Sequence, residues 1–202
     1  MKKFLFVLVI VVSCLNIQAQ NDSARIIEDK QEESGNRTIF TNDVLFAKGK
    51  DKNGIESDES LNLAYFRYFI KNGESIDRYS ICIPRTSFIR MTLAKGRKLL
   101  LKLDNDSIIT LRTQAEIRSY DNCYSPSLNC YKVDYIYPAT ENDLRKIKNS
   151  KVLKIRMEED DGFTDMTPTE YNEQFNFSER IHECFDLIQS ALKKSNSVYD
   201  NF

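Results

Sequence analysis

The stretch LNLAYFRYFI, residues 61–70, carries a large apolar side chain at most of its positions. Successive residues of a strand point to opposite faces, so Leu61, Leu63 and Tyr65 share one face. Phe66 and Tyr68 fall on the other face, which is therefore apolar as well. A strand with two apolar faces is covered on both sides, so this stretch predicts a central strand of a sheet.

Further strands are predicted around this one. The segment RKLLLKLDNDSIITLRT, residues 97–113, has two β-rich arms around the turn formers Asp104 to Ser107, a pattern typical of a hairpin. By similar patterns, strands are expected within 38–50, 79–84, 131–137 and 152–158.

Two helices are predicted in the second half of the chain. Thr140 followed by Asp143 resembles a capping box and predicts a short helix there. From about 178 to 194 the apolar residues fall within one sector of a helical projection. The strand–helix–strand order over 131–158 permits a parallel crossover. We expect one α+β domain, a mostly antiparallel sheet of about six strands with the longer helix packed on one face.

The first residues predict export. Met1-Lys2-Lys3 precedes the apolar run FLFVLVIVV, which is too short to span a bilayer and is typical of a signal peptide. Cleavage after Ala19 gives a signal peptide over 1–19, a flexible polar leader over 20–36, the domain over 37–195 and a tail over 196–202. The alternative is cleavage before Cys14, because VVSC resembles a lipobox, and Cys14 would then carry lipid.

The charge balance argues against two classes of partner. The chain has 29 Lys and Arg against 30 Asp and Glu. Loss of residues 1–19 removes Lys2 and Lys3, which leaves 27 basic against 30 acidic residues and a net charge of −3. Nucleic acids and anionic membrane surfaces select basic patches. We expect neither as a partner, and membrane attachment only through lipid on Cys14.

Four cysteines remain after export, because Cys14 is either removed or acylated. An even number in an exported chain indicates two disulfides. Cys123 and Cys130 flank the loop YSPSLN, and their bond would contribute about 2.5 kcal/mol on the loop-entropy account. A bond between Cys82 and Cys184 follows only by elimination, and two buried free thiols are the alternative.

No catalytic constellation is visible in the sequence. His182 opens the string HECFD, which starts like the zinc motif H-E-x-x-H with Asp186 in place of the second histidine. His182 is the single histidine of the chain, whereas catalytic zinc needs three protein ligands. We expect a surface pair at His182 and Asp186, no metal and no cofactor.

The aromatic residues suggest a binding surface. Tyr131, Tyr135 and Tyr137 share one face of the strand at 131–137, and could line a groove for a sugar or a peptide. Tyrosines on a half-buried sheet face are the ordinary alternative.

Two segments resemble a known group of proteins. KLLLKLDNDSIITLRT and YPATENDLRKIKNSKVLKIRME are similar to stretches of small uncharacterised exported proteins of the Bacteroidota, over about residues 97–158. The resemblance implies a fold and an envelope location, and it assigns no catalytic residue.

We expect a non-enzymatic envelope protein, periplasmic or extracellular, or lipid-anchored in the outer membrane, that binds a protein or a glycan. One alternative is a hydrolase that uses carboxylates such as Asp160 or Asp165, which requires a pocket with two nearby carboxyl groups, one of them buried. Another is a structural component of an envelope complex, which requires an exposed apolar patch.

Overall fold

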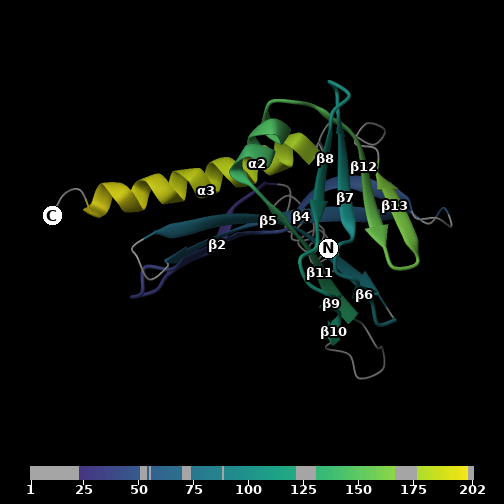
Figure 1. Cartoon of the computed structure of the whole chain (residues 1–202), viewed down its shortest axis with the longest axis horizontal. Helices are drawn as coiled ribbons and strands as arrows, with labels where there is room; N and C mark the ends of the chain where they lie inside the picture. Colours follow the sequence, from purple (N-terminus) through teal and green to yellow (C-terminus); the bar gives the residue numbers. More distant parts are fainter. Residues whose placement is uncertain are drawn as a thin grey trace, which may run out of the picture.

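The computed structural model describes residues 23–50, 54, 56–69, 74–87, 89–121, 131–166 and 177–199. A bent antiparallel sheet forms most of this part of the chain, and two helices pack against it (Figure 1). The expected class is thus confirmed, one α+β domain with a mostly antiparallel sheet.

The main sheet has 11 strands in the described residues. They are β1 (Ile26–Gln31), β2 (Arg37–Thr41), β3 (Val44–Lys50), β4 (Glu56–Phe69), β5 (Ser75–Ser87), β7 (Lys98–Leu103), β8 (Ile108–Arg112), β10 (Tyr120–Asp121), β11 (Tyr131–Ala139), β12 (Val152–Glu159) and β13 (Gly162–Met166). A second, two-stranded sheet consists of β6 (Thr92–Leu93) and β9 (Ile117–Arg118).

The expected central strand is β4, which belongs to both halves of the main sheet. One half contains β10, β11, β5 and β4, with β2 and β1 beside β4, and the other continues from β4 through β3, β13, β12, β7 and β8. The ladder between β4 and β5 ends at Asn62 and Cys82. Beyond that pair, β4 continues along β3 and β5 continues along β11. The two strands therefore diverge, and the candidate site lies at this fork.

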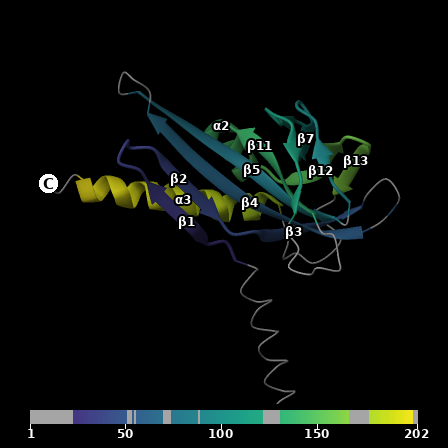
Figure 2. The ribbon, with the colours of Figure 1, turned by 90° about the horizontal axis from the view of Figure 1, so that it is seen from below.

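Both predicted helices are present. In α2 (Glu141–Lys148), the Thr140 hydroxyl accepts from the Asp143 N–H at 3.1 Å, and the Asp143 carboxylate accepts from the Thr140 N–H at 3.1 Å. This is the expected capping box. The second helix, α3 (Phe177–Tyr199), is longer than expected, because it continues into the tail expected over 196–202. It lies along β2 and β4 (Figure 2).

The core lies between α3 and the inner faces of both halves of the sheet. Phe46 of β3 meets Phe177 of α3 with ring centroids 5.1 Å apart, and Tyr79 of β5 meets Phe185 at 5.5 Å. The hairpin of β7 and β8 presents Leu99, one of its fully buried leucines, to the same core. One apolar cluster thus connects α3 with both halves.

Three expectations need correction. The leader expected over 20–36 contains β1, whose backbone pairs with β2 and whose Asp29 accepts from Arg37 at 2.9 Å. Its polar side chains face solvent, so the sequence shows no apolar alternation there, although backbone hydrogen bonds hold the strand. The estimate of about six strands is too low, because short strands such as β13 carry weak patterns. The permitted parallel crossover does not form, since every described ladder is antiparallel.

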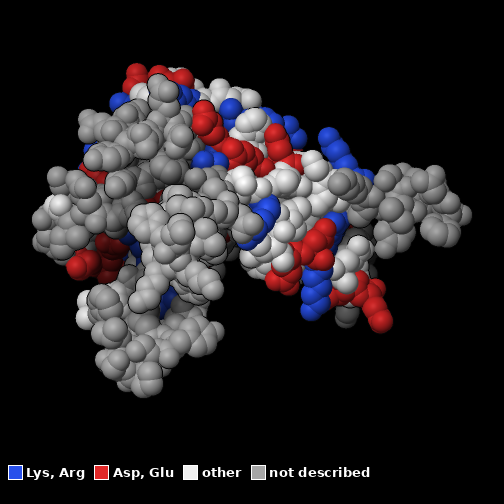
Figure 3. All heavy atoms as spheres, turned by 180° about the vertical axis from the view of Figure 1, so that it is seen from behind, with Lys and Arg blue, Asp and Glu red and all other residues white. Residues whose placement is uncertain are grey.

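The surface mixes both signs of charge. On the face seen in Figure 3, acidic and basic side chains are interspersed. Among the described residues, no helix has the length and apolar character needed to cross a membrane.

Candidate functional site

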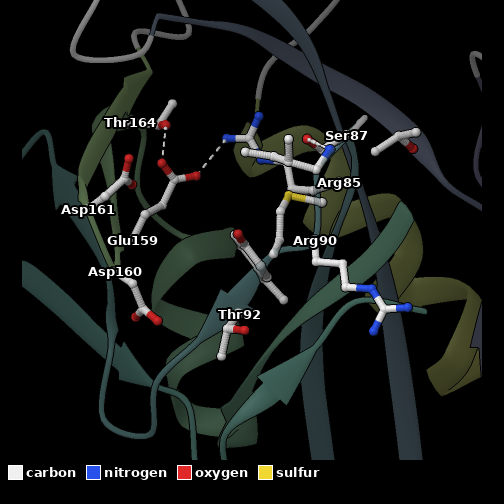
Figure 4. Close-up of a pocket in the computed structure, with 12 residues that line it drawn as sticks. Arg85, Ser87, Arg90, Thr92, Glu159, Asp160, Asp161 and Thr164 are labelled. Atoms are coloured by element: carbon white, nitrogen blue, oxygen red, sulfur yellow. Dashed lines mark hydrogen bonds and ion pairs between the residues drawn. The ribbon is translucent and has the colours of Figure 1, made fainter. Parts of the chain in front are cut away.

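A cavity of about 630 Å³ opens at the fork between β4 and β5. Its walls come from the end of β5, the segment 89–92, β11 and the turn between β12 and β13 (Figure 4). The lining residues are Arg85, Thr86, Ser87, Ile89, Arg90, Met91, Thr92, Tyr135, Glu159, Asp160, Asp161 and Thr164. The lining is therefore rich in hydroxyl and charged groups, with a few apolar side chains.

An ion-paired cluster bridges the fork. Arg85 of β5 donates from Nη1 to Oε1 of Glu59 on β4 at 2.6 Å, and its Nη2 lies 3.8 Å from Oε1 of Glu159. The Glu59 side chain is 1% exposed and that of Arg85 is 15% exposed. Where the backbone ladder ends, one guanidinium thus joins β4, β5 and the end of β12.

Glu159 is the acid of this cluster that reaches the cavity. Burial raises its pKa above the ordinary value for a glutamate, and the Arg85 charge opposes this shift. The Thr164 hydroxyl donates to Oε2 of Glu159 at 3.3 Å and also favours the charged form. Glu159 is therefore oriented by two neighbours and holds its proton more firmly than an exposed glutamate does.

Asp160 and Asp161 extend this acidic wall. Oδ1 of Asp160 accepts from the Ala94 N–H at 2.9 Å and from Nε of Arg97 at 2.9 Å. In Figure 4, Glu159, Asp160 and Asp161 occupy one side of the cavity, and Arg90 points away from them. The three acids lie on the same side because they are consecutive residues at the turn from β12 to β13.

Tyr135 completes the lining of the cavity, and Tyr137 lies on the same strand face but is not part of the lining. Tyr135 is 4% exposed and lines the cavity, and its hydroxyl has no hydrogen-bond partner in the described part of the chain. Burial, and then the charge of Glu159, raises the Tyr135 pKa to about 12. Tyr137 is fully buried, and its hydroxyl also lacks a partner among the described residues. The buried Tyr137 hydroxyl without a partner costs the fold about 1–3 kcal/mol, whereas the Tyr135 side chain lines the cavity, where a ligand can reach its hydroxyl.

The expected tyrosine surface is only partly realised. Tyr131, Tyr135 and Tyr137 share one face of β11, as the alternation predicts. That face is turned to the interior, so Tyr137 offers no exposed area, and Tyr135 is the one of the three that lines the cavity. Tyr131 is half-buried, and the Arg90 guanidinium lies 5.3 Å from the centroid of its ring.

The pairing of Cys82 with Cys184 is wrong, because both are free thiols. Cys82 lies between Ile81 and Ile83 on β5, and it points to the face of the sheet opposite to α3. Cys184 lies on α3 and contacts the Thr41 hydroxyl, with Oγ1 and Sγ 3.5 Å apart. Both side chains are buried, which is the alternative the sequence left open. Cys14, Cys123 and Cys130 lie outside the described residues.

The remaining candidate residues from the sequence, apart from Asp160, lie away from the cavity. Nε2 of His182 lies 2.8 Å from Oδ2 of Asp186, and Oδ1 of Asp186 accepts from Lys148 at 2.9 Å, so the expected surface pair is confirmed. Asp165 faces outward and accepts from Arg156 at 2.6 Å. In the described residues, no group of three or more His, Cys, Asp or Glu side chains is placed to hold a metal ion. Of the two acids considered for a hydrolase, Asp160 alone lines the cavity.

The sequence interpretation missed Glu59, Arg85 and Glu159. A signal for two of them exists, because Glu59 continues the face of Leu61 on β4, and Arg85 continues the face of Ile83 on β5. A charged residue at a core-facing position requires a partner of opposite charge. The pairing of Glu59 with Arg85 depends on the register of β4 and β5, which no local pattern shows.

Comparison with protein-family models, with curated proteins and with solved structures finds no match to this chain.

Proposed function

We propose that this chain is an exported envelope protein that binds a glycan in the cavity at the fork, without acting on it chemically. The cavity volume of about 630 Å³ lies within the range of about 300–1,000 Å³ that small-ligand sites occupy. Sugar hydroxyls both donate and accept hydrogen bonds, and the lining supplies both kinds of group. Thr92 and Ser87 offer hydroxyls, and Asp161 offers acceptor oxygens.

The observation that carries the proposal is the Tyr135 hydroxyl. The Tyr135 side chain is 4% exposed and lines the cavity, and its hydroxyl has no hydrogen-bond partner in the described part of the chain. Such a hydroxyl can bond a ligand without first losing a hydrogen bond within the protein.

The test uses protein isolated from the envelope of its host. A printed glycan array identifies a ligand, and calorimetry then compares wild type with Tyr135→Phe. Loss of one hydrogen bond, about 1 kcal/mol, weakens binding about fivefold. The control is Tyr68→Phe, which changes a tyrosine on β4 that is 48% exposed. Absence of any glycan ligand, or equal affinity in wild type and Tyr135→Phe, would overturn the proposal.

A second function is favoured by the raised pKa of Glu159, since a carboxyl group that keeps its proton can act as a general acid. Asp160, fixed by Ala94 and Arg97, would supply the second carboxylate of a hydrolase. An assay for reducing ends, run on the protein–glycan mixture from the same titration, separates binding from hydrolysis. Slow appearance of reducing ends from the bound glycan, abolished in Glu159→Gln, would make the cavity an active site.

A structural role in an envelope complex has weaker support. The exposed large apolar side chains that would form a patch include Ile27 on β1, Ile108 on β8 and Phe163 on β13. They are spread over different strands, and single exposed apolar residues are ordinary on protein surfaces.

A further inference from the structure

A second cavity lies between two strand edges. Its volume is about 570 Å³, and its lining includes residues 76–79 of β5, 110–112 of β8 and 138–141, where β11 ends and α2 begins. This edge groove shares no lining residue with the cavity at the fork. It is therefore a separate site.

β8 presents an open edge to this groove. It is the last strand of the main sheet and pairs with β7 alone. The Thr113 N–H donates to the Arg97 carbonyl in register with that ladder, so the odd-numbered residues of β8 turn their backbone groups to β7. The backbone groups of Thr110 and Arg112 consequently point to the open side. In the described part of the chain they have no hydrogen-bond partner.

β5 has an open edge at the same groove. Its ladder with β11 ends at Tyr79. On β4, the Leu63 N–H donates to the Thr41 hydroxyl on the side of β2, so the Leu63 backbone is turned away from β5. Its ladder partner Ile81 therefore turns its own backbone groups to β11, and Asp77 does the same by alternation. Because β11 has ended there, the Asp77 backbone meets no partner within the described residues.

Two rows of backbone donors and acceptors thus border one groove. An extended peptide pairs with such an edge through its own N–H and C=O groups, and its alternate side chains set the specificity. β5 and the start of α2 form the wall opposite β8. The groove therefore has room for one extended segment and not for the edge of a second sheet.

The charges of the groove favour an acidic peptide. Each acid of the lining is engaged by the protein: Asp77 with Arg67, Glu141 with Arg145, and Asp143 with the N-terminal cap of α2. Arg112 donates to the Gly96 carbonyl at 3.3 Å, and neither Arg112 nor Arg78 has an acidic partner among the described residues. A carboxylate of the ligand would thus meet two arginines whose charges the protein does not neutralise.

We propose that the edge groove binds an extended acidic segment of a partner protein, which pairs with β8 as an added strand and directs carboxylates toward Arg78 and Arg112. The inference does not depend on glycan binding, since the two sites have no lining residue in common.

The experiment uses three labelled heptapeptides, acetyl-Thr-Val-Glu-Val-Glu-Val-Thr-amide and its counterparts with Gln or Lys in place of Glu. Each is titrated into the protein by fluorescence anisotropy at low ionic strength. We expect the Glu peptide to bind about fivefold more tightly than the Gln peptide, and the Lys peptide to bind least. Arg78→Gln should weaken binding of the Glu peptide about threefold.

The matched control is Arg118→Gln. Arg118 lies on β9, its side chain is 78% exposed, and it does not line the groove. Equal affinity for the three peptides, or equal losses in Arg78→Gln and Arg118→Gln, would show that the groove does not select acidic segments and would overturn the inference.

Hydrogen exchange tests the backbone pairing. Saturation with the Glu peptide should slow exchange of the Thr110 and Arg112 amides at least about tenfold and leave that of Leu111, which already bonds β7, unchanged. Thr110→Pro removes the outward donor at a position where an edge strand tolerates proline, and should abolish binding. Thr110→Val keeps the N–H and should retain binding. Protection of Leu101 on β7 confirms that the proline variant is folded.

Three results would overturn the inference. One is that none of the three peptides binds. Another is that a peptide binds without slowing exchange of Thr110, or binds Thr110→Pro as well as wild type. The third is a dimer in sedimentation that Thr110→Pro dissociates, since a second copy of the chain would then occupy the edge of β8.

Discussion

Glu59 and Arg85 form an ion pair that is largely shielded from solvent, since the Glu59 side chain is 1% exposed. Removal of one partner of such a pair leaves an uncompensated buried charge, which costs about 3–5 kcal/mol. Replacement of both by apolar residues is often neutral. The pair therefore contributes less to net stability than to fixing how β4 and β5 diverge around the cavity.

Glu159 is predicted to make stability fall as pH rises. Its pKa is raised in the folded protein, mainly by burial. Its favourable contribution is therefore complete below the ordinary glutamate pKa of about 4.3, and is lost as pH rises through the raised folded value. Glu159→Gln should lose less stability than wild type between mildly acidic and neutral pH. Urea unfolding at several pH values measures this difference.

Asp165→Asn provides a control of opposite sign. Its hydrogen bond with Arg156 lowers the Asp165 pKa in the folded protein. Its contribution is present above the unfolded aspartate pKa and is lost as pH falls through the lowered folded value. The free energies of unfolding of wild type and Asp165→Asn should therefore converge at acidic pH. If both variants shift the curve in the same direction, the account of Glu159 is wrong.

Patterns in the sequence correctly predicted features that depend on residues close together along the chain. Thr140 and Asp143 are three apart, and their capping box forms as expected. Glu59 and Arg85 are distant in the sequence, so their pairing required the strand register. The alternation on β11 was also correct, but it could not show that this face is turned inward.

At the scale of elements, α2 depends on its N-terminal cap. Thr140→Ala removes the side-chain acceptor for the Asp143 N–H and should cost about 1 kcal/mol of unfolding free energy. Thr140→Ser keeps the hydroxyl and should cost much less. The urea midpoints of the two variants measure the difference. Equal losses in Ala and Ser would show that the cap does not stabilise the domain.

The element boundaries were predicted less well than the elements. The hairpin of β7 and β8 formed around the expected turn, where Asp106 has a positive φ of 62°. The strand β1 was missed because its residues after Ile26 are all exposed. Its stability comes from pairing with β2, and a pattern of buried residues cannot reveal such pairing.

The whole molecule is predicted to carry two inert thiols and one disulfide. Cys82 and Cys184 are buried, and burial raises the pKa of Cys82 to about 12 and that of Cys184 to about 11. Thiolate is the reactive form, so neither should be alkylated in the native protein. After unfolding without reductant we expect two labels, and after reduction four, because Cys123 and Cys130 are predicted to be paired.

The labels are counted from the intact mass of the alkylated protein, and the same mass also tests where the signal peptide is cleaved. A bare chain starting at residue 20 would support the signal peptide over 1–19, and a chain starting at Cys14 with added lipid mass would support membrane anchoring. Four labels before reduction would exclude the Cys123–Cys130 disulfide. Label on the native protein would contradict the burial of Cys82 and Cys184.

The sharing of β4 has a consequence for when the chain can fold. Strands of the two halves alternate along the sequence, and β3 pairs with β13, which is synthesised roughly a hundred residues later. The helix that covers β2 and β4 is the last element of all. Neither half can be completed while the C-terminal third is still being made. For an exported protein, as we propose, this order would keep the polypeptide unfolded during translocation and postpone folding until the chain has crossed the membrane.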